Sequence, residues 1–503
     1  MTQEEIIEKR KSKFISWFNK TDNLILISIL VFALVLWIYF FIITMNQPLW
    51  WDEACYGSIA TNLVTHIWDD TALIIGETKI RPFIFPFIWS ILIRLGFQES
   101  YSRFLLEFIP SILTVLFVYL STKELYGKKV AVFSSIIFSG LWIHLFYTFR
   151  FMTDIPSMAF LYLSIYLFIL ATKSDLNKKY FLFSLIFLAF STLMRYTNGL
   201  FFLIYLFMLI ISKKFLIKDK KFWIYGIIGI SPLLLFFIFN YFSQGNVFPA
   251  LFGNYLNPAQ IDGKPAPFAW HFLNYVYIYL TTPFFIIFIL GLFIVLSELI
   301  IGYNFIFKNI NLRNHLFLIL LFITVYSFFI FYLKGAEDRY FLASSLTLCS
   351  FAGIGLSYIY SFIKRYNSIV SIVLVLVILV TGLYFQITFA NDLIKIKKDS
   401  FIQMKQGFEW MEGNSPPGSI IAGSGVEPYA IYYSQFRTFT LPDNKTDQDK
   451  ILNADYLVYH FFTPQQSYIP AYLQDNQDKW IGLNAWFFDS EQKQPAFVIY
   501  KKS

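Results

Sequence analysis

Long apolar runs, separated by short polar segments, make up most of this 503-residue chain. A run of about 20 apolar residues forms a helix that can cross the hydrocarbon core of a bilayer. We expect eleven such runs, at residues 24–44, 104–122, 130–149, 155–172, 180–196, 198–212, 222–242, 283–302, 315–333, 340–361 and 368–389. The pattern predicts a mainly α fold, a polytopic transmembrane helix bundle of about eleven spans with additional surface helices.

The distribution of Lys and Arg predicts the orientation of these spans. If residues 1–23 lie in the cytoplasm, most basic residues fall in the alternate loops, for example at Lys123–Lys129, Lys173–Lys179 and Lys213–Lys221. Cytoplasmic loops of membrane proteins are enriched in basic residues, so we expect a multi-pass protein of the cell membrane with its N-terminus inside. This topology explains the net charge of +8. Membrane lipids are expected partners, and a nucleic-acid partner is not expected.

Two apolar stretches after the first span are expected at the surface, within a first outer loop at residues 45–103. Pro82–Phe97 is short for a span and contains two prolines and Arg94, which favours a surface or re-entrant segment. Between Tyr56 and Ile67, apolar residues recur at helical spacing. This spacing predicts an amphipathic helix that lies on the membrane.

The composition turns polar beyond residue 390, at the end of a bundle domain that spans residues 24–390. Residues 391–503 contain short β-like runs and one helix-like stretch, at Ser419–Ala422, Glu427–Ser434, Thr438–Leu441, Tyr456–Tyr459 and Ala496–Tyr500. They predict a small α/β domain. Because the last span ends on the outer side in the expected topology, this domain is expected to be extracytoplasmic.

Asp52 and Glu53 come directly after the first span, in a chain of which 57% is hydrophobic and only 14% is charged. Acidic side chains are costly beside a membrane, so the pair is a candidate functional site. Asp52 begins the predicted amphipathic helix on its apolar side, and Glu53 follows about 100° further round. The alternative is that Asp52 only caps the helix, a position where Asp is favoured.

Further charged residues are expected on the same outer side of the membrane. They are Lys79, Arg81, Arg103, Arg150, Asp154 and Arg339. One carboxylate could take a proton from an acceptor hydroxyl, arginines could hold a departing phosphate, and other carboxylates could stabilise an oxocarbenium-like sugar. This set suits inverting sugar transfer from a polyprenyl-phosphate carrier. The alternatives are solvated loops or, for Arg150 and Asp154, a simple ion pair.

The motif Asp52-Glu53-x-x-Tyr56 resembles the first-loop motif of the GT-C superfamily of glycosyltransferases, in particular the dolichyl-phosphate-mannose protein mannosyltransferase and aminoarabinose-lipid A transferase group. The likeness covers about residues 24–390 and continues in order through Arg81-Pro82, Ser102-Arg103-Phe104, Thr122–Gly127, Arg150–Pro156 and Asp338–Phe341. It implies transfer of a hexosyl or pentosyl group from a polyprenyl-phosphate donor, of the dolichyl-phosphate type, to a protein, lipid or glycan acceptor at the outer face.

The resemblance also implies residue roles, with Asp52 as the catalytic base. The expected site residues are Asp52, Glu53 and Asp154 for catalysis, Arg81, Arg339 and Lys79 for binding of the donor phosphate, and Tyr56, Arg103, Arg150 and Tyr340 for substrate positioning. Thr78-Lys79-Ile80 stands where aminoarabinose transferases have an acidic metal ligand. No cofactor is therefore assigned, and a requirement for a divalent metal ion stays open.

A transporter or flippase of a lipid-linked sugar is the main alternative, because such a protein also places charges in a polytopic bundle. Transporters bury their ionisable residues near the middle of the membrane, in broken helices. Here the charged residues cluster at the ends of spans, which favours an enzyme at the interface. A noncatalytic scaffold that binds partners through its outer domain does not explain why three outer loops carry both acidic and basic residues.

The expected orientation can be tested with a protease site placed after Ser503. Because the basic loops favour a cytoplasmic N-terminus and an odd number of spans follows it, we expect cleavage in intact cells by protease added from outside. The same site placed before residue 23 serves as the control and should be cut only after the membrane is permeabilised. Cleavage of the site after Ser503 from the cytoplasmic side alone would contradict the expected topology.

Overall fold

The structure, a computed structural model, describes residues 21–65, 81–173, 176–212, 219–244, 270–333, 337–443, 445–489 and 491–503. The chain forms two compact units. The helical unit comprises Met1–Ile43, Phe104–Phe149 and Thr153–Leu393. The mixed unit comprises Thr44–Arg103, Arg150–Met152 and Ile394–Ser503.

Apolar helices, most of them long, make up the helical unit. Their bounds are α2 Thr21–Thr44, α7 Ile109–Tyr126, α8 Lys128–Ser139, α9 Trp142–Tyr147, α10 Asp154–Thr172, α11 Lys178–Met194, α12 Leu200–Ser212, α13 Lys220–Gln244, α14 Trp270–Ile301, α15 Ile310–Ser327, α16 Ser345–Lys364 and α17 Ser368–Lys397. Short 3₁₀ or π-helical segments are Phe104–Phe108, Tyr196–Gly199, Tyr303–Phe305, Phe328–Leu333 and Asp338–Ser344. The last residues of α17 belong to the mixed unit.

Among the described residues, eight helical stretches are long and apolar enough to cross a membrane. They are Asn23–Thr44, Glu99–Tyr126, Asp154–Thr172, Lys220–Phe242, Asn274–Ile301, Ile310–Phe331, Asp338–Lys364 and Ser368–Lys397. The other three expected spans coincide with shorter helices, because α11 and α12 have 17 and 13 residues and the run 130–149 is divided between α8 and α9. A mainly helical, multi-pass fold with a small C-terminal sheet confirms the predicted fold class.

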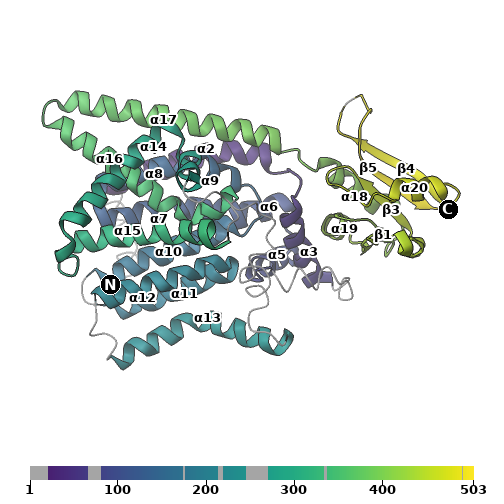
Figure 1. The fold of residues 1–503 in the computed structure, drawn as a ribbon, viewed down its shortest axis with the longest axis horizontal. Coiled ribbons are helices and arrows are strands. Elements are labelled where there is room, and N and C mark those ends of the chain that lie inside the picture. The colour runs from purple at the N-terminus through teal and green to yellow at the C-terminus, as the bar shows by residue number, and fades with distance from the viewer. Residues whose placement is uncertain are drawn as a thin grey trace, which may run out of the picture. The chain divides into compact units, whose positions relative to one another are not determined.

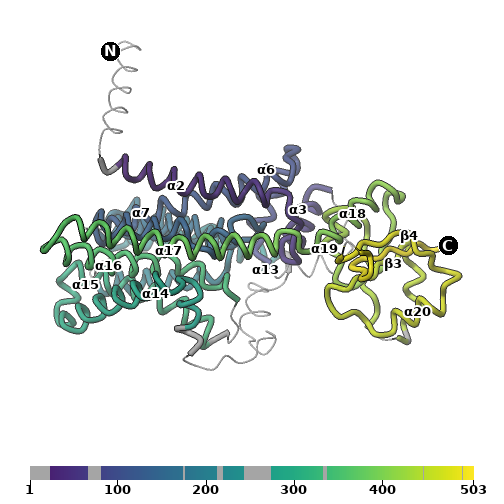
Figure 2. Tube along the Cα trace, turned by 90° about the horizontal axis from the view of Figure 1, so that it is seen from above, coloured from purple at the N-terminus to yellow at the C-terminus, as the bar shows by residue number. Residues whose placement is uncertain are grey.

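The helices of the helical unit pack in a row. α10 lies between α7 and α11, α13 covers the far side of α11, and α8, α16 and α14 follow from α7 in the other direction (Figure 1). Seen from above, α2 lies on one side of the bundle and α14 and α15 lie on the other (Figure 2). Small residues allow the closest approaches. A Cβ at Gly291 of α14 would overlap the Phe351 carbonyl of α16, as is typical of helix packing in membranes.

The buried side chain of Gln386 on α17 forms hydrogen bonds with two backbone groups of neighbouring helices. Neither group has a hydrogen-bond partner within its own helix. Pro283 inside α14 has no N–H, so the Tyr279 carbonyl one turn earlier loses its helical hydrogen bond. Gln386 Nε2 donates to that carbonyl at 3.0 Å. Trp142 begins α9, where N–H groups have no helical acceptor, and its N–H donates to Gln386 Oε1 at 2.8 Å. One side chain thus stabilises both the proline kink and a helix start.

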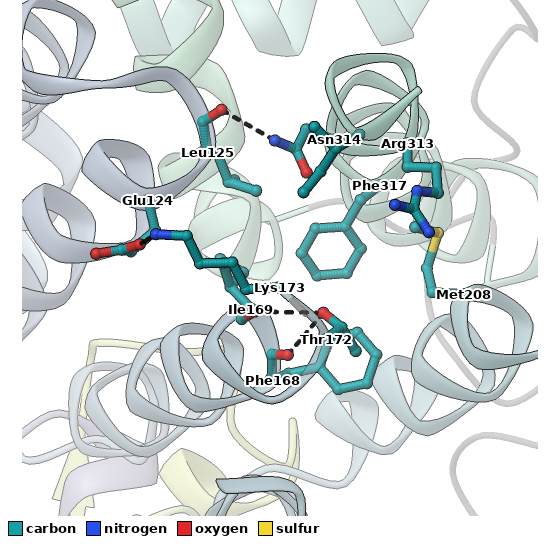
Figure 3. A pocket seen from close by; sticks show the side chains of 11 residues that line it. Glu124, Leu125, Phe168, Ile169, Thr172, Lys173, Met208, Arg313, Asn314 and Phe317 are labelled. Atoms are coloured by element: carbon teal, nitrogen blue, oxygen red, sulfur yellow. Dashed lines mark hydrogen bonds and ion pairs between the residues drawn. The ribbon is translucent and has the colours of Figure 1, made fainter. Parts of the chain in front are cut away.

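The run Thr122–Gly127 comprises the last residues of α7 and Gly127, the single residue between α7 and α8. Gly127 ends α7 with a φ of 84°, a left-handed conformation that favours glycine. Asn314 of α15 donates through Nδ2 to the Leu125 carbonyl at 3.0 Å, and Tyr126 donates through its hydroxyl to the Asn314 carbonyl at 3.1 Å. Figure 3 shows the adjacent pocket, whose volume of about 60 Å³ has room for only a few water molecules. In the structure, this motif joins α7, α8 and α15.

The mixed unit combines the first loop with the C-terminal segment. Its helices are α3 Trp51–Thr65, α5 Ile84–Arg94, α6 Glu99–Arg103, α18 Ile402–Asn414, α19 Glu427–Ser434 and α20 Ile469–Asp475, with a 3₁₀ segment at Lys445–Asn453. Its strands are β1 Ile420–Ala422, β2 Arg437–Phe439, β3 Tyr456–His460, β4 Trp480–Phe487 and β5 Pro495–Lys502. The sheet has the order β2-β1-β3-β5-β4, with β1 parallel to β2 and β3, and β5 antiparallel to β3 and β4.

The sheet matches the predicted β-like runs except at β4, which the sequence analysis missed. β4 contains Gly482 and Asn484, residues that are uncommon in strands, and its register shifts between them. Buried Ile421 pairs with Tyr456, and Ala422 pairs with Leu457. Helix α19 has the bounds expected from the sequence, Glu427–Ser434. α5 has 11 residues, too few to cross a bilayer as a helix.

Helix α3 packs against protein in the structure. Its residues from Glu53 to Thr61 are buried, and it contacts α5 and α19. At Gly57 a Cβ would overlap the Tyr432 ring of α19, so a residue without a side chain is required for this approach. The expected apolar face of α3 therefore exists. We expected this face to lie on the membrane, but α5 and α19 cover it in the structure. Ile67 lies outside the described residues.

We expect Gln386→Leu to destabilise the protein, because both backbone groups would stay buried without a partner. The expected loss is about 2–6 kcal/mol, since each such group costs about 1–3 kcal/mol. Thermal unfolding of the detergent-solubilised protein measures the effect. Thr381→Val, at an exposed position on the same helix, is the control. Equal unfolding temperatures for the two variants would show that the two Gln386 hydrogen bonds contribute nothing to stability.

Candidate active site

Asp52 and Arg81 form an ion pair at the start of α3. Asp52 Oδ1 lies 3.0 Å from Arg81 Nη2, and the two side chains are 26% and 14% exposed. The guanidinium carbon of Arg81 lies 5.2 Å from the ring centroid of Tyr56, one turn along α3. The first turn of a helix favours negative charge because the helix dipole is positive there. The structure therefore presents a carboxylate and a guanidinium group side by side, both partly accessible.

Glu53, the next residue, is fully buried. Its Oε1 lies 3.7 Å from Arg150 Nη1, whose side chain is 2% exposed. Burial raises the pKa of the Glu53 carboxyl above its usual value, and the guanidinium groups of Arg150 and Arg103 oppose this rise. Neighbouring carboxylates thus differ in environment, because Asp52 is partly accessible and Glu53 is enclosed.

Arg150 connects three segments of the mixed unit. Its guanidinium carbon lies 3.8 Å from the ring centroid of Trp50, which precedes α3. Its Nη2 donates to the Lys397 carbonyl at the end of α17 at 3.1 Å. Together with the Glu53 contact, these interactions fix the start of α3 against residues that are distant in the sequence.

Arg103 is the centre of a second buried network. It pairs with Glu99 at 3.1 Å and donates to the Gln47 carbonyl at 3.2 Å. Its guanidinium carbon lies 4.4 Å from the ring centroid of Phe151, next to Arg150 in the sequence. The Tyr432 hydroxyl of α19 donates to Glu99 at 3.2 Å. Helix α19 of the C-terminal segment is thereby joined to the loop that carries Asp52.

The remaining described candidates belong to the helical unit. Asp154 begins α10, is 3% exposed and forms an ion pair with Arg195, directly after α11. Arg195 and Arg339 each lie 5.8 Å from the ring centroid of Tyr340. Arg339 also pairs with Glu337 at 2.6 Å. Asp154, Arg339 and Tyr340 are thus linked, directly or through Arg195, within one unit.

Sequence reasoning missed several members of these networks. Arg195 follows an apolar run, and Glu99 stands one helical turn before Arg103, so their spacing was visible in the sequence. The contribution of Tyr432 was not visible in the sequence, because Tyr432 lies 333 residues away from Glu99. Lys79 lies outside the described residues. Among the residues that the structure describes, no group of three His, Cys, Asp or Glu side chains could hold a metal ion.

Comparison with known proteins connects this architecture to a superfamily. The model of the family described as dolichyl-phosphate-mannose-protein mannosyltransferase matches residues 80–239, a stretch that includes Arg81, Arg103, Arg150 and Asp154. No curated protein sequence matches the chain. The solved structures that resemble it include ArnT from Cupriavidus metallidurans bound to undecaprenyl phosphate, with a TM-score of 0.63 and 11% identity over 94% of this chain and 97% of that chain.

A second similar structure is the oligosaccharyltransferase AglB from Archaeoglobus fulgidus, in complex with an inhibitory peptide and a dolichol-phosphate. Its TM-score is 0.59, with 13% identity over 97% of this chain and 75% of that chain. Both proteins are GT-C glycosyltransferases. The family match and the shared fold confirm the resemblance to the GT-C superfamily that the sequence motifs predicted.

We expect Arg150→Met to destabilise the mixed unit by about 3–5 kcal/mol, the usual cost of leaving a buried charge without its partner. The loss should grow with pH. The folded state already raises the pKa of Glu53, so the protonated form is tolerated at low pH and the penalty appears as Glu53 ionises.

Thermal unfolding at pH 5 and pH 8 measures this dependence on pH. Arg94→Met is the matched control, because Arg94 is exposed in the same unit and donates to the Leu63 carbonyl. Loss of stability that is equal at both pH values would mean that Glu53 does not ionise in the variant and that the contact with Arg150 is not an ion pair.

Proposed function

We propose that the chain is an inverting glycosyltransferase that moves a hexosyl or pentosyl group from a polyprenyl-phosphate donor to a protein, lipid or glycan acceptor at the outer membrane face. The observation that carries the proposal is the partly accessible ion pair between Asp52 and Arg81. A carboxylate can act as the base and a guanidinium group can bind the departing phosphate. The GT-C fold and the undecaprenyl and dolichol phosphates bound to the similar structures add support.

In the proposed reaction Asp52 is the general base. It takes the proton from an acceptor hydroxyl while the hydroxyl oxygen attacks the anomeric carbon of the donor sugar. The bond between that carbon and the phosphate oxygen breaks, and polyprenyl phosphate leaves as a stable anion, so no general acid is required. Attack occurs on one face and no enzyme nucleophile takes part, so the anomeric configuration inverts.

Arg81 is the proposed donor-phosphate ligand next to the base. A guanidinium group binds phosphate through two parallel hydrogen bonds. When the donor binds, Arg81 exchanges its carboxylate partner for the phosphate, and Asp52 becomes available to accept the proton. Arg339 and Lys79 are proposed as further phosphate ligands. Arg339 then has to give up its contact with Glu337 in the same way.

The buried members of the site are proposed as positioning residues. Glu53, Arg103 and Arg150 are 0–1% exposed, so they act through the backbone and rings that they hold rather than by direct contact with substrate. Tyr56 supports Arg81 through its ring. Asp154 and Tyr340 are proposed as a second acidic group and an aromatic positioning residue. Fixed polar groups of this kind reduce the reorganisation needed in the transition state.

If Asp52 is the base, Asp52→Asn should lower turnover about 10²–10⁴-fold while donor binding persists, because the amide cannot accept the proton. The assay measures sugar transfer and release of polyprenyl phosphate from a panel of labelled polyprenyl-phosphate sugars. Asp478→Asn, at an exposed position of the mixed unit, is the control.

Two results would contradict the proposal. Near-normal turnover in a folded Asp52→Asn protein would assign Asp52 to capping of α3. Movement of the intact lipid-linked sugar across a vesicle membrane, with its bond to phosphate unbroken, would identify a transporter or flippase.

A further inference from the structure

A pocket of about 580 Å³ opens in the mixed unit, beside the start of α3. Ligand-binding pockets usually have volumes of about 300–1,000 Å³. Aromatic side chains form much of its wall, and polar groups lie between them. The principal lining residues are Trp50, Lys397, Asp399, Phe401, Phe462 and Phe488.

The aromatic wall depends on an unusual turn between α17 and α18. Phe401 has a φ of 68°, in the left-handed region that non-glycine residues rarely adopt. Its ring lies 5.1 Å from that of Phe462, which in turn lies 5.1 Å from that of Phe488. Gln403, also in the wall, donates through Nε2 to the Phe487 carbonyl at 3.0 Å. Strained residues of this kind are found preferentially at binding sites, where the surrounding structure holds them in place.

The pocket and the candidate active site share two residues. Trp50 lines the pocket, and the guanidinium group of Arg150 lies over its ring. Lys397 also lines the pocket, and its carbonyl accepts a hydrogen bond from Arg150. Arg150 contacts Glu53, next to the proposed base Asp52. A ligand in the pocket therefore contacts the residues that hold the start of α3 in position.

The mixed polar and apolar wall, which also includes Ile396 and Ile402, fits the donor's lipid tail less well than it fits a sugar. A polyprenyl chain requires a continuous apolar surface, whereas Lys397, Asp399, Ser400 and Gln403 interrupt this wall with polar groups. Lys397 and Asp399 carry opposite charges, so the wall does not select for a polyanion. Aromatic faces next to carboxylate, amide and hydroxyl groups suit a sugar ring. The C–H faces of the ring stack on the aromatic groups, and its hydroxyls bind the polar ones.

We propose that this pocket binds a neutral saccharide portion of the acceptor. The proposal rests on the proposed glycosyltransferase function and names its acceptor class as a glycan or glycoconjugate. The saccharide stacks against Phe462, Phe488 and Trp50, and its hydroxyls are bound by Asp399 and Gln403. A hydroxyl at the end of the bound saccharide then extends along Trp50 towards Asp52.

Binding of neutral trisaccharides to the purified full chain in detergent tests the proposal. Maltotriose, cellotriose, mannotriose and N,N′,N″-triacetylchitotriose are the probes, and saturation-transfer NMR is the measurement. Phe488→Ala and Phe461→Ala form a matched pair, because these phenylalanines are 46% and 47% exposed and only Phe488 lines the pocket. We expect binding of at least one trisaccharide, weakened about 2- to 10-fold by Phe488→Ala and unchanged by Phe461→Ala.

A second measurement separates this inference from the proposed function. With a polyprenyl-phosphate sugar that the wild type uses, Phe488→Ala should raise the acceptor KM by the same factor and leave the donor KM unchanged. If the wild type transfers no sugar from any such donor, the proposed function fails, while trisaccharide binding still decides the assignment of the pocket. The inference is overturned if no trisaccharide binds, or if the two variants bind the trisaccharides equally well. It is also overturned if a fixed pool of random hexapeptides binds in a Phe488-dependent way when no trisaccharide does.

Discussion

Polar groups that are buried away from water need partners within the protein, and this constraint governs both units of the structure. In the helical unit, Gln386 provides hydrogen bonds to the Tyr279 carbonyl and the Trp142 N–H. These backbone groups lose their helical partners at a proline and at a helix start. In a bilayer no water replaces such partners. A side chain from a helix that is distant in the sequence therefore stabilises the kink in α14 and the start of α9.

The same constraint acts on the ionisable groups of the mixed unit. Glu53 and Arg150 are each buried, and their opposite charges offset part of the desolvation cost. Arg103 has a carboxylate, a carbonyl and an aromatic face as partners. These networks bring together the first loop, residues 150–152 and the C-terminal segment. Asp52 stands next to them on α3 but stays partly accessible, which is the combination that a positioned general base requires.

The sequence was sufficient to predict the parts of the fold that depend on local patterns. Apolar runs predicted the long helices, and turn residues between short β-like runs predicted most of the C-terminal sheet. The register-shifted β4 was missed because Gly482 and Asn484 weaken the strand pattern. The packing of α3 under α19 was also missed. An apolar helix face can be buried by lipid or by protein, and the local sequence does not distinguish the two.

For the candidate site, the sequence suggested candidate residues but not the contacts between them. Asp52, Glu53 and Arg81 were recognisable from their position beside a span and from a family resemblance. The burial of Glu53 and its contact with Arg150 depend on residues almost a hundred positions apart, and Tyr432 is more distant still. Hydrophobic spacing contains no information about such pairs. Such long-range ion pairs follow from packing and not from the local sequence.

Trp50 shows why the packing matters for mechanism. One indole ring is in contact with the Arg150 guanidinium and also lines the 580 Å³ pocket. Arg150 in turn contacts the carboxylate next to the proposed base. A group that enters the pocket therefore acts on the same rigid set of side chains that fixes the first turn of α3. If the pocket binds the acceptor as proposed, acceptor binding and positioning of the base act through this shared set of side chains.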